Sequence, residues 1–241
     1  MSGHSKWATI RRKKGALDAK RGKLFTKLIK ELTIAAREGG GDPDGNPRLR
    51  LAVDNAKAAN MPADNIERAI KKATGELEGV SYHELTYEGY AHGGVAVLLE
   101  VATDNKNRTV AEVRHIFSKY GGAMGENGSV AWMFDKKGII TIPKQNESED
   151  DIMAVILDAG AEDLSAEDEF YEITSPVESF ESVRKALIEN QIEIENASLQ
   201  WIAKNTVSVE GDDAEKVMKC IEALEDSDDV QSVYSNADFV E

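Results

Sequence analysis

The sequence predicts an α+β protein in which an N-terminal three-helix domain precedes two ferredoxin-like α/β domains, the third inserted in the second. Three apolar stripes at helical spacing occupy the first 75 residues, and strands alternate with helices from about residue 80. The helices are few for the number of strands, which favours helices on one face of a mainly antiparallel sheet over a doubly wound parallel sheet. The expected domains are 1–78, then 79–134 together with 205–241, and the inserted segment 135–204.

The composition is that of a folded protein large enough for two or three domains. The chain has 241 residues, of which 41% are hydrophobic and 30% are charged. A single cysteine, Cys220, cannot form a disulfide within the chain. No apolar run reaches the roughly 18 residues of a membrane span, and no apolar segment follows the basic N-terminus. We therefore expect a cytoplasmic protein without a secretory signal or a membrane partner.

Charge is distributed unevenly along the chain. Residues 1–75 hold 17 Lys and Arg against 8 Asp and Glu, whereas residues 76–241 hold 12 against 36. The net charge of −15 therefore combines a basic start with an acidic remainder. Such asymmetry is typical of a polyanion-binding module joined to other domains, and the acidic remainder would confine a polyanion to one end.

The first helix is predicted over residues 20–38, after an arm (residues 1–19) that has no apolar period. Five apolar side chains of this helix fall within an arc of about 140°: Leu24, Phe25, Leu28, Ile29 and Leu32. Four lysines, here called the lysine row, fall within about 80° on the opposite side: Lys20, Lys23, Lys27 and Lys30. Ile34 breaks this pattern because it lies on the lysine side.

Two further helices complete the predicted N-terminal bundle. Asn46 and Pro47 are an N-cap and a first helical residue, and Pro62 opens the third helix in a similar way. Their apolar stripes are Leu49, Ala52, Val53 and Ala56, then Ile66, Ala69, Ile70 and Ala73. Three short helices with facing stripes form a small bundle.

The remaining elements follow from apolar runs and capping patterns. Strands are predicted at 95–102, 129–134, 138–142, 170–174, 199–203, 206–209 and 230–234. Helices are predicted at 109–117, where Thr109 and Glu112 form a capping box, and at 150–159, 175–188 and 212–224. The order from 138 to 203, strand, helix, one or two strands, helix, strand, fits a split β-α-β unit, and the segments on either side of it could complete a second unit.

No enzyme signature is present. The four histidines form no H-E-x-x-H pattern, and one cysteine excludes a cysteine-based zinc site. The glycines at 121–128 lack the Lys-Ser/Thr of a phosphate-binding loop, so a helix cap and a turn account for them. We therefore predict no catalysis, no metal site, no cofactor and no small-molecule substrate.

The basic N-terminal segment is the candidate binding site. Residues 1–30 carry ten basic side chains and one acidic one, Asp18, and Lys or Arg near phosphates releases condensed counterions and so favours nucleic-acid binding. Trp7 either stacks on a base or pins the arm to the bundle, and the second role is favoured. The predicted contacts are Lys6, Trp7, Arg11, Arg12, Lys13, Lys14, Lys20, Arg21, Lys23, Lys27 and Lys30.

A second anion-site candidate lies between a strand and a capped helix. It comprises Asn107, Arg108 and Arg114, since a cation at a helix start favours an anion there. Capping by Asn107 or Thr109 accounts for much of the same segment without any ligand.

Ordered motifs along nearly the whole chain resemble those of the YebC/PmpR family. They are Gly3-His4-Ser5-Lys6-Trp7, Asp18 to Lys23, Gly39 to Pro43, Asn46 to Leu49, Tyr87 to Tyr90, Asn107 to Arg114, Gly128 to Val130 and Leu224 to Tyr234. The resemblance implies three domains, the third inserted in the second, and a cytoplasmic regulator of transcription that binds DNA. It brings no catalytic residues.

The same resemblance also supports a different role. Mitochondrial relatives look like translational activators of cytochrome c oxidase, and bacterial members are linked to translation at the ribosome. The sequence has neither a clear helix-turn-helix nor the aromatic strand motif of common RNA readers. Two hypotheses therefore stand: a DNA-binding transcriptional regulator, or a translation factor that binds ribosomal RNA.

Overall fold

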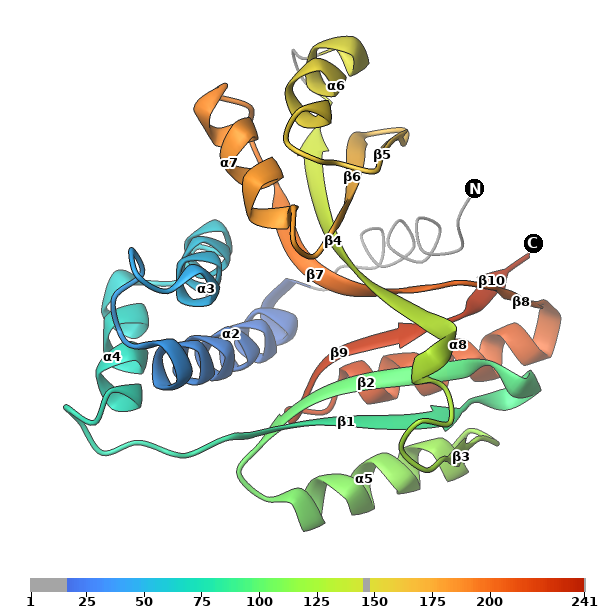
Figure 1. The fold of residues 1–241 in the computed structure, drawn as a ribbon. Coiled ribbons are helices and arrows are strands. Elements are labelled where there is room, and N and C mark those ends of the chain that lie inside the picture. Colours follow the sequence, from blue (N-terminus) through green and yellow to red (C-terminus); the bar gives the residue numbers. More distant parts are fainter. Residues whose placement is uncertain (1–16, 145–147, 241) are drawn as a thin grey trace.

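The computed structural model describes residues 17–144 and 148–240, with side chains from Arg21 onward. Figure 1 shows three parts: a helical domain, a middle domain with a four-stranded sheet, and an inserted domain that rises from the middle one. The predicted α+β class is confirmed, as is the insertion of one α/β domain in another.

The helical domain contains α2 (Leu17–Gly39), α3 (Pro47–Ala58) and α4 (Ala63–Ala73). Asn46 joins the first two of these helices. Its Oδ1 accepts a hydrogen bond from the backbone N–H of Leu49 at 3.0 Å, which confirms it as the N-cap of α3. Its Nδ2 donates to the carbonyls of Ala35 and Gly40, so the same side chain also binds the C-terminal end of α2.

The core of the helical domain is formed by the predicted apolar stripes. Its buried members include Leu32, Leu49, Ala52, Ala56 and Ile66. Leu24 is an exception within the predicted stripe, because about half of its surface stays exposed.

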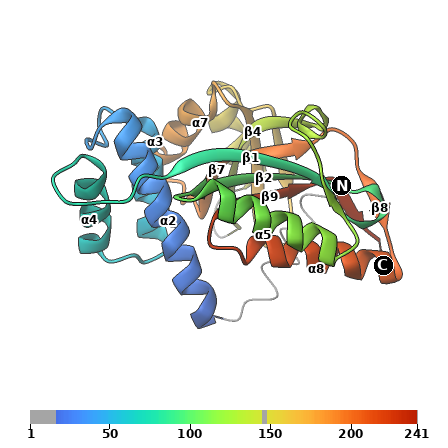
Figure 2. The same cartoon turned by 90° about the horizontal axis from the view of Figure 1, so that it is seen from below.

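The middle domain has a sheet with the strand order β3-β1-β2-β9 and antiparallel neighbours. The strands are β1 (His83–Tyr90), β2 (Ala96–Thr103), β3 (Ala123–Met124) and β9 (Val230–Ser235). Helices α5 (Lys106–Lys119) and α8 (Gly211–Glu225) lie side by side on one face of this sheet (Figure 2). A parallel pair, β8 (Val207–Val209) and β10 (Ala237–Phe239), adjoins them.

Strand β2 is central to this domain because it is buried on both faces. Val97, Leu99 and Val101 pack against α5 and α8. Ala96 and Leu98 belong to a second cluster on the opposite face. A strand buried on both faces reads as a continuous apolar run, which explains why this strand was predicted correctly.

The inserted domain follows the ferredoxin-like order strand, helix, strand, strand, helix, strand. Its elements are β4 (Phe134–Pro143), α6 (Glu149–Leu157), β5 (Asp163–Ala166), β6 (Phe170–Pro176), α7 (Phe180–Glu189) and β7 (Asn196–Ala203). The antiparallel sheet has the order β5-β6-β4-β7, and both helices pack on one face.

Strands β4 and β7 connect the inserted domain to the middle domain (Figure 1). They pair from Phe134 with Ala203 to Thr141 with Asn196. Phe134 and Trp201, near the base of this pair, pack on the face of the middle sheet opposite its helices.

The strand predicted at 129–134 is wrong. This segment is a turn followed by a short 3₁₀ helix, Ala131–Met133, and β4 begins at Phe134. The buried carboxylate of Glu88 accepts hydrogen bonds from the backbone N–H groups of Gly128, Val130 and Ala131 at 2.6–2.8 Å. Those groups are therefore unavailable to a sheet.

Candidate nucleic-acid interface

Most of the predicted basic cluster lies outside the described residues. This applies to Lys6, Trp7, Arg11, Arg12, Lys13 and Lys14. Lys20 belongs to α2, but its side chain is also outside the description. The structure therefore places four of the predicted contacts, Arg21, Lys23, Lys27 and Lys30.

Arg21 lies near the start of α2 and is exposed. Its guanidinium lies 5.6 Å from the centre of the Phe25 ring, one turn later. A cation above an aromatic face gains a modest attraction and keeps its hydrogen-bond donors free for a second partner. Arg21 is thus an exposed cation near the start of α2.

Lys30 does not lie on an outward face, and that prediction is wrong. Its side chain is only 7% exposed and its Nζ lies 2.7 Å from Oδ1 of Asp229. The same ammonium donates to the backbone carbonyls of Ala102 and Asp228, and it lies 5.4 Å from the centre of the Tyr82 ring. All three of its protons are used within the protein, so it is not available to a phosphate.

Lys23 and Lys27 contact the C-terminal end of α8. The Nζ of Lys23 donates to the carbonyl of Asp226 at 3.0 Å and lies 3.1 Å from its Oδ1. The Nζ of Lys27 donates to the carbonyl of Glu225 at 3.0 Å. The last carbonyls of a helix carry partial negative charge and favour cations. Lys23, Lys27 and Lys30 therefore dock the helical domain on the middle domain.

The carboxylate of Asp229 is the centre of this docking. Burial alone would raise its pKa, but hydrogen bonds from Arg108, Lys30 and Thr109 outweigh burial and hold the pKa well below its usual range. Thr103 donates a further hydrogen bond at 3.1 Å. Asp229 is thus ionised and fully coordinated by groups from three segments of the chain.

In the second predicted anion site, Arg108 already forms ion pairs within the protein. Arg108 pairs with Asp229 at 2.7 Å and with Asp104 at 2.8 Å, so its charge is already balanced. Asn107 and Arg114 are exposed on α5.

The capping assigned to this segment is wrong as well. The N-cap of α5 is Asn105, whose Oδ1 accepts from the N–H of Arg108 at 3.1 Å. Thr109 is buried and directs its hydroxyl to Asp229, so it cannot cap the helix. The local sequence could not reveal a partner 120 residues away.

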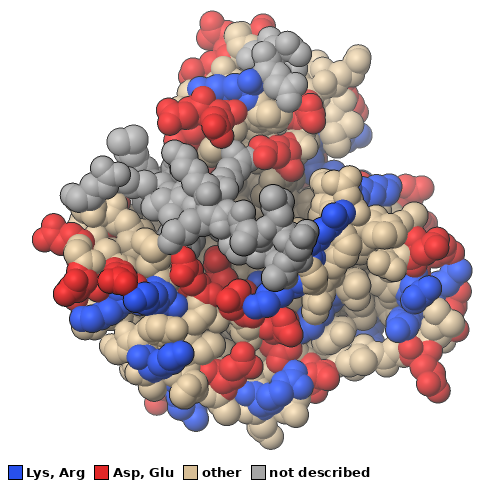
Figure 3. All heavy atoms as spheres, turned by 180° about the vertical axis from the view of Figure 1, so that it is seen from behind, with Lys and Arg blue, Asp and Glu red and all other residues tan. Residues whose placement is uncertain are grey.

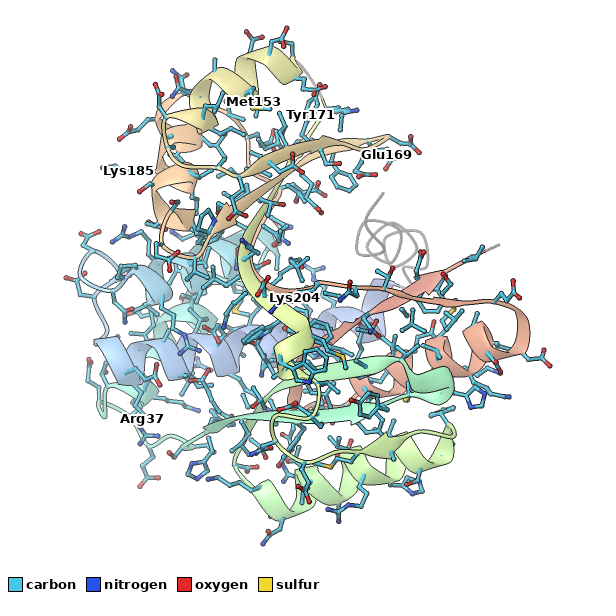
Figure 4. The ribbon with its side chains drawn as sticks, turned by 45° about the vertical axis from the view of Figure 1, so that its right-hand side comes forward. Arg37, Met153, Glu169, Tyr171, Lys185 and Lys204 are labelled. Atoms are coloured by element: carbon cyan, nitrogen blue, oxygen red, sulfur yellow. The ribbon has the colours of Figure 1, made fainter. Side chains whose placement is uncertain are left out.

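Two unpredicted cations line a groove between α2 and the first turn of α5. The groove has a volume of about 290 Å³ and includes Arg37 and Lys106. Figure 4 shows Arg37 extending outward at this edge of the molecule. Glu38 and Glu84 line the same groove and both bind Arg48, so its charge is mixed rather than basic.

One face of the molecule shows positive and negative side chains mixed together (Figure 3). In Figure 3, Lys and Arg side chains are interspersed with Asp and Glu over the described residues of that face. Within residues 17–144 and 148–240, no three His, Cys, Asp or Glu side chains are grouped to hold a metal ion. None of the helices in this part of the chain is long and apolar enough to cross a membrane.

Comparison with known proteins adds two family matches that together span most of the chain. A family model described as the TACO1/YebC protein N-terminal domain matches residues 5–76. A second model, described as the TACO1/YebC second and third domain, matches residues 82–237.

Individual relatives agree with these models. A protein of Chlorobaculum parvum named probable transcriptional regulatory protein is 60% identical over 242 residues, covering all of this chain and 96% of the relative. A protein of the same description from Chlorobaculum tepidum is 59% identical over the same shares. The crystal structure of a conserved hypothetical protein, Aq1575 of Aquifex aeolicus, matches with a TM-score of 0.86 and 47% identity over 93% of each chain.

Proposed function

Because the chain belongs to the TACO1/YebC family, we propose that it is a cytoplasmic, DNA-binding regulator of gene expression that contacts phosphates through its basic N-terminal segment. The relatives named above carry the name of probable transcriptional regulatory proteins, which supports a regulator rather than an enzyme. DNA is proposed as the target because their name refers to transcription.

The observation that carries the proposal is the excess of basic residues ahead of the docked part of α2. Lys23, Lys27 and Lys30 hold the helical domain against the middle domain. The basic residues before them face a single acidic residue, Asp18, and they are Lys6, Arg11, Arg12, Lys13, Lys14, Lys20 and Arg21. An acidic remainder repels phosphates from other surfaces, which leaves this segment as the best contact for a polyanion.

A salt series on binding tests the contact surface. The full-length chain is titrated into a fluorescent duplex DNA and, separately, into a structured RNA, at several salt concentrations. Each neutralised phosphate contributes about −0.9 to the log–log slope on duplex DNA. Replacing Arg11, Arg12, Lys13 and Lys14 with Gln should flatten the slope by up to about three to four units.

The control changes the same number of charges at positions distant from this segment in the sequence. It replaces the exposed lysines Lys119, Lys144, Lys185 and Lys216 with Gln. If both quadruple variants change the slope equally, the N-terminal segment is not the contact surface.

Crosslinking in cells tests the choice of target. The protein is crosslinked to its ligands, and the attached nucleic acid is sequenced. Promoter DNA is the expected result. If the attached nucleic acid is predominantly ribosomal RNA, the target is the ribosome and not DNA.

A further inference from the structure

The acidic end of α8 binds Lys23, which directly follows the basic segment that the proposed function uses. We propose that Asp226 is an internal competitor, which occupies Lys23 in the free protein and is displaced by a nucleic-acid phosphate on binding. This inference rests on the proposed function. It adds that the carboxylate of Asp226 lowers the affinity of the protein for nucleic acid.

Two ion pairs made by Lys30 and Lys23 differ in their exposure to water. The Lys30–Asp229 pair is closed off from water, with both side chains 7% exposed. The Lys23–Asp226 pair is open to water, with side chains 41% and 68% exposed. Exposed ion pairs are weak and readily exchange partners, whereas buried pairs do not. Lys30 therefore anchors the helical domain, while Lys23 can change its partner without undocking that domain.

The geometry at Lys23 allows a phosphate to replace only the carboxylate. The ammonium has three donors, and it uses two of them on oxygens of one residue, the carbonyl and Oδ1 of Asp226. The carbonyl contact holds the end of α8 and need not break. A phosphate oxygen that takes the place of Oδ1 leaves that contact in position.

Lys23 is also placed to extend the proposed contact surface. It follows Lys20 and the exposed Arg21 in the first turns of α2. A polyanion bound to those residues therefore passes close to Lys23, and there it meets the negative charge of Asp226. Removing that charge should both release Lys23 and remove the repulsion.

A neighbouring carboxylate separates these two effects. Asp228 is exposed in the same acidic turn, and the structure gives its carboxylate no lysine or arginine partner among the described residues. Asp228→Asn therefore removes the same charge at nearly the same place without releasing a lysine. Both substitutions keep the backbone carbonyls that bind Lys23 and Lys30.

The test compares the two variants with the unaltered full-length chain by fluorescence anisotropy on a duplex DNA and a structured RNA. At low salt, Asp226→Asn should tighten binding by about two- to five-fold more than Asp228→Asn, the effect of releasing one exposed pair. Its log–log salt slope on duplex DNA should match that of the unaltered chain, because Lys23 contacts a phosphate in both complexes. Equal affinities for the two variants would overturn the inference.

Lys23→Gln provides the second measurement. In that background Asp226→Asn should match Asp228→Asn, because there is no lysine to release. A gain specific to Asp226→Asn that persists without Lys23 would also contradict the inference. If the quadruple N-terminal variant loses binding while Asp226→Asn equals Asp228→Asn, the proposed function stands and only this inference fails. If the quadruple variant binds normally, the proposed function itself fails.

Discussion

The Nζ of Lys30 and Oδ1 of Asp229 lie 2.7 Å apart in a buried ion pair, although 199 positions separate the two residues in the chain. Arg108 binds the other carboxylate oxygen at 2.7 Å. One side chain thus joins the first described helix, the start of α5 and the turn before β9. The stability of the domain arrangement should depend strongly on this carboxylate.

Asp229→Asn is expected to lower the free energy of unfolding by about 3 kcal/mol, because it leaves Lys30 as a buried charge without its counterion. Urea denaturation at pH 7 measures the change. Asp228→Asn, at the adjacent and exposed position, should stay within about 0.5 kcal/mol of the unaltered chain. Equal losses for the two variants would contradict the role given to the buried pair.

The pH dependence of that loss follows from the lowered pKa of Asp229. A carboxyl whose pKa is lower in the folded state stabilises the fold above its unfolded pKa of about 3.9, and this contribution is lost as pH falls toward the folded value. The stability difference between the unaltered chain and Asp229→Asn should therefore be constant from about pH 8 to pH 5 and narrow only below about pH 4. Denaturation curves across this range check it, and narrowing near neutral pH would be inconsistent with an ionised Asp229.

Arg184 links the inserted domain to the helical domain. Its side chain is 6% exposed and binds Asp54 of α3 at 2.7 Å and Glu181 at 3.0 Å. Arg184→Lys should cost about 1–2 kcal/mol, because an ammonium cannot reproduce the planar fork that serves both carboxylates.

The adjacent Lys185 is the matched control for this substitution. It is 72% exposed and extends outward from α7 (Figure 4). Lys185→Arg should change stability by less than about 0.5 kcal/mol. Thermal and urea unfolding of the two variants measure the difference, and a neutral Arg184→Lys would show that the interdomain contact is dispensable.

Glu88→Gln should destabilise the protein by about 2–3 kcal/mol. Burial would raise the pKa of Glu88, but hydrogen bonds from Gly128, Val130 and Ala131 lower it. A glutamine keeps one acceptor oxygen and turns a donor toward N–H groups that need an acceptor. Glu126→Gln, exposed in the same loop, should have little effect on the urea midpoint. Similar midpoints for both variants would mean that the turn does not need the charge.

Two glycines should respond to alanine in opposite directions. A Cβ at Gly89 would lie 2.8 Å from both the carbonyl oxygen of Ala123 and Cζ of Phe117, so Gly89→Ala should be destabilising by about 1–3 kcal/mol. A Cβ at Gly22 of α2 meets no atom of the described residues within 4 Å, so Gly22→Ala should be stabilising by about 0.5–1 kcal/mol. Differential scanning calorimetry of both variants tests the two signs, and a stabilised Gly89→Ala would contradict the packing described here.

Local sequence patterns predicted most helices because their signals lie within one segment. Asn46 and Pro47 mark the start of α3, and the apolar stripe of each bundle helix lies within that helix. The burial of Lys30 has no such signal, because its partner is in a distant turn. The one local clue was Ile34, which lies on the lysine side of α2 and is buried. An apolar residue in a lysine row indicates that the row faces protein rather than solvent.

Strand β1 was not predicted for a related reason. The face of β1 opposite Leu85 and Tyr87 carries Glu84 and the buried Glu88, which are unfavourable in an isolated strand pattern. Glu84 binds Arg48 of the helical domain, and Glu88 binds the turn at 128–131. Both partners are remote in sequence, so the sequence of the strand alone does not indicate what binds its two carboxylates.

The docking of α2 on the end of α8 has a consequence for synthesis of the protein. Translation makes the helical domain before residues 225–228, whose carbonyls bind Lys23, Lys27 and Lys30. While the intervening residues are synthesised, the three ammonium groups therefore lack these partners. The nascent chain presents a more basic surface than the folded protein, and synthesis of residues 225–228 is the step that neutralises it.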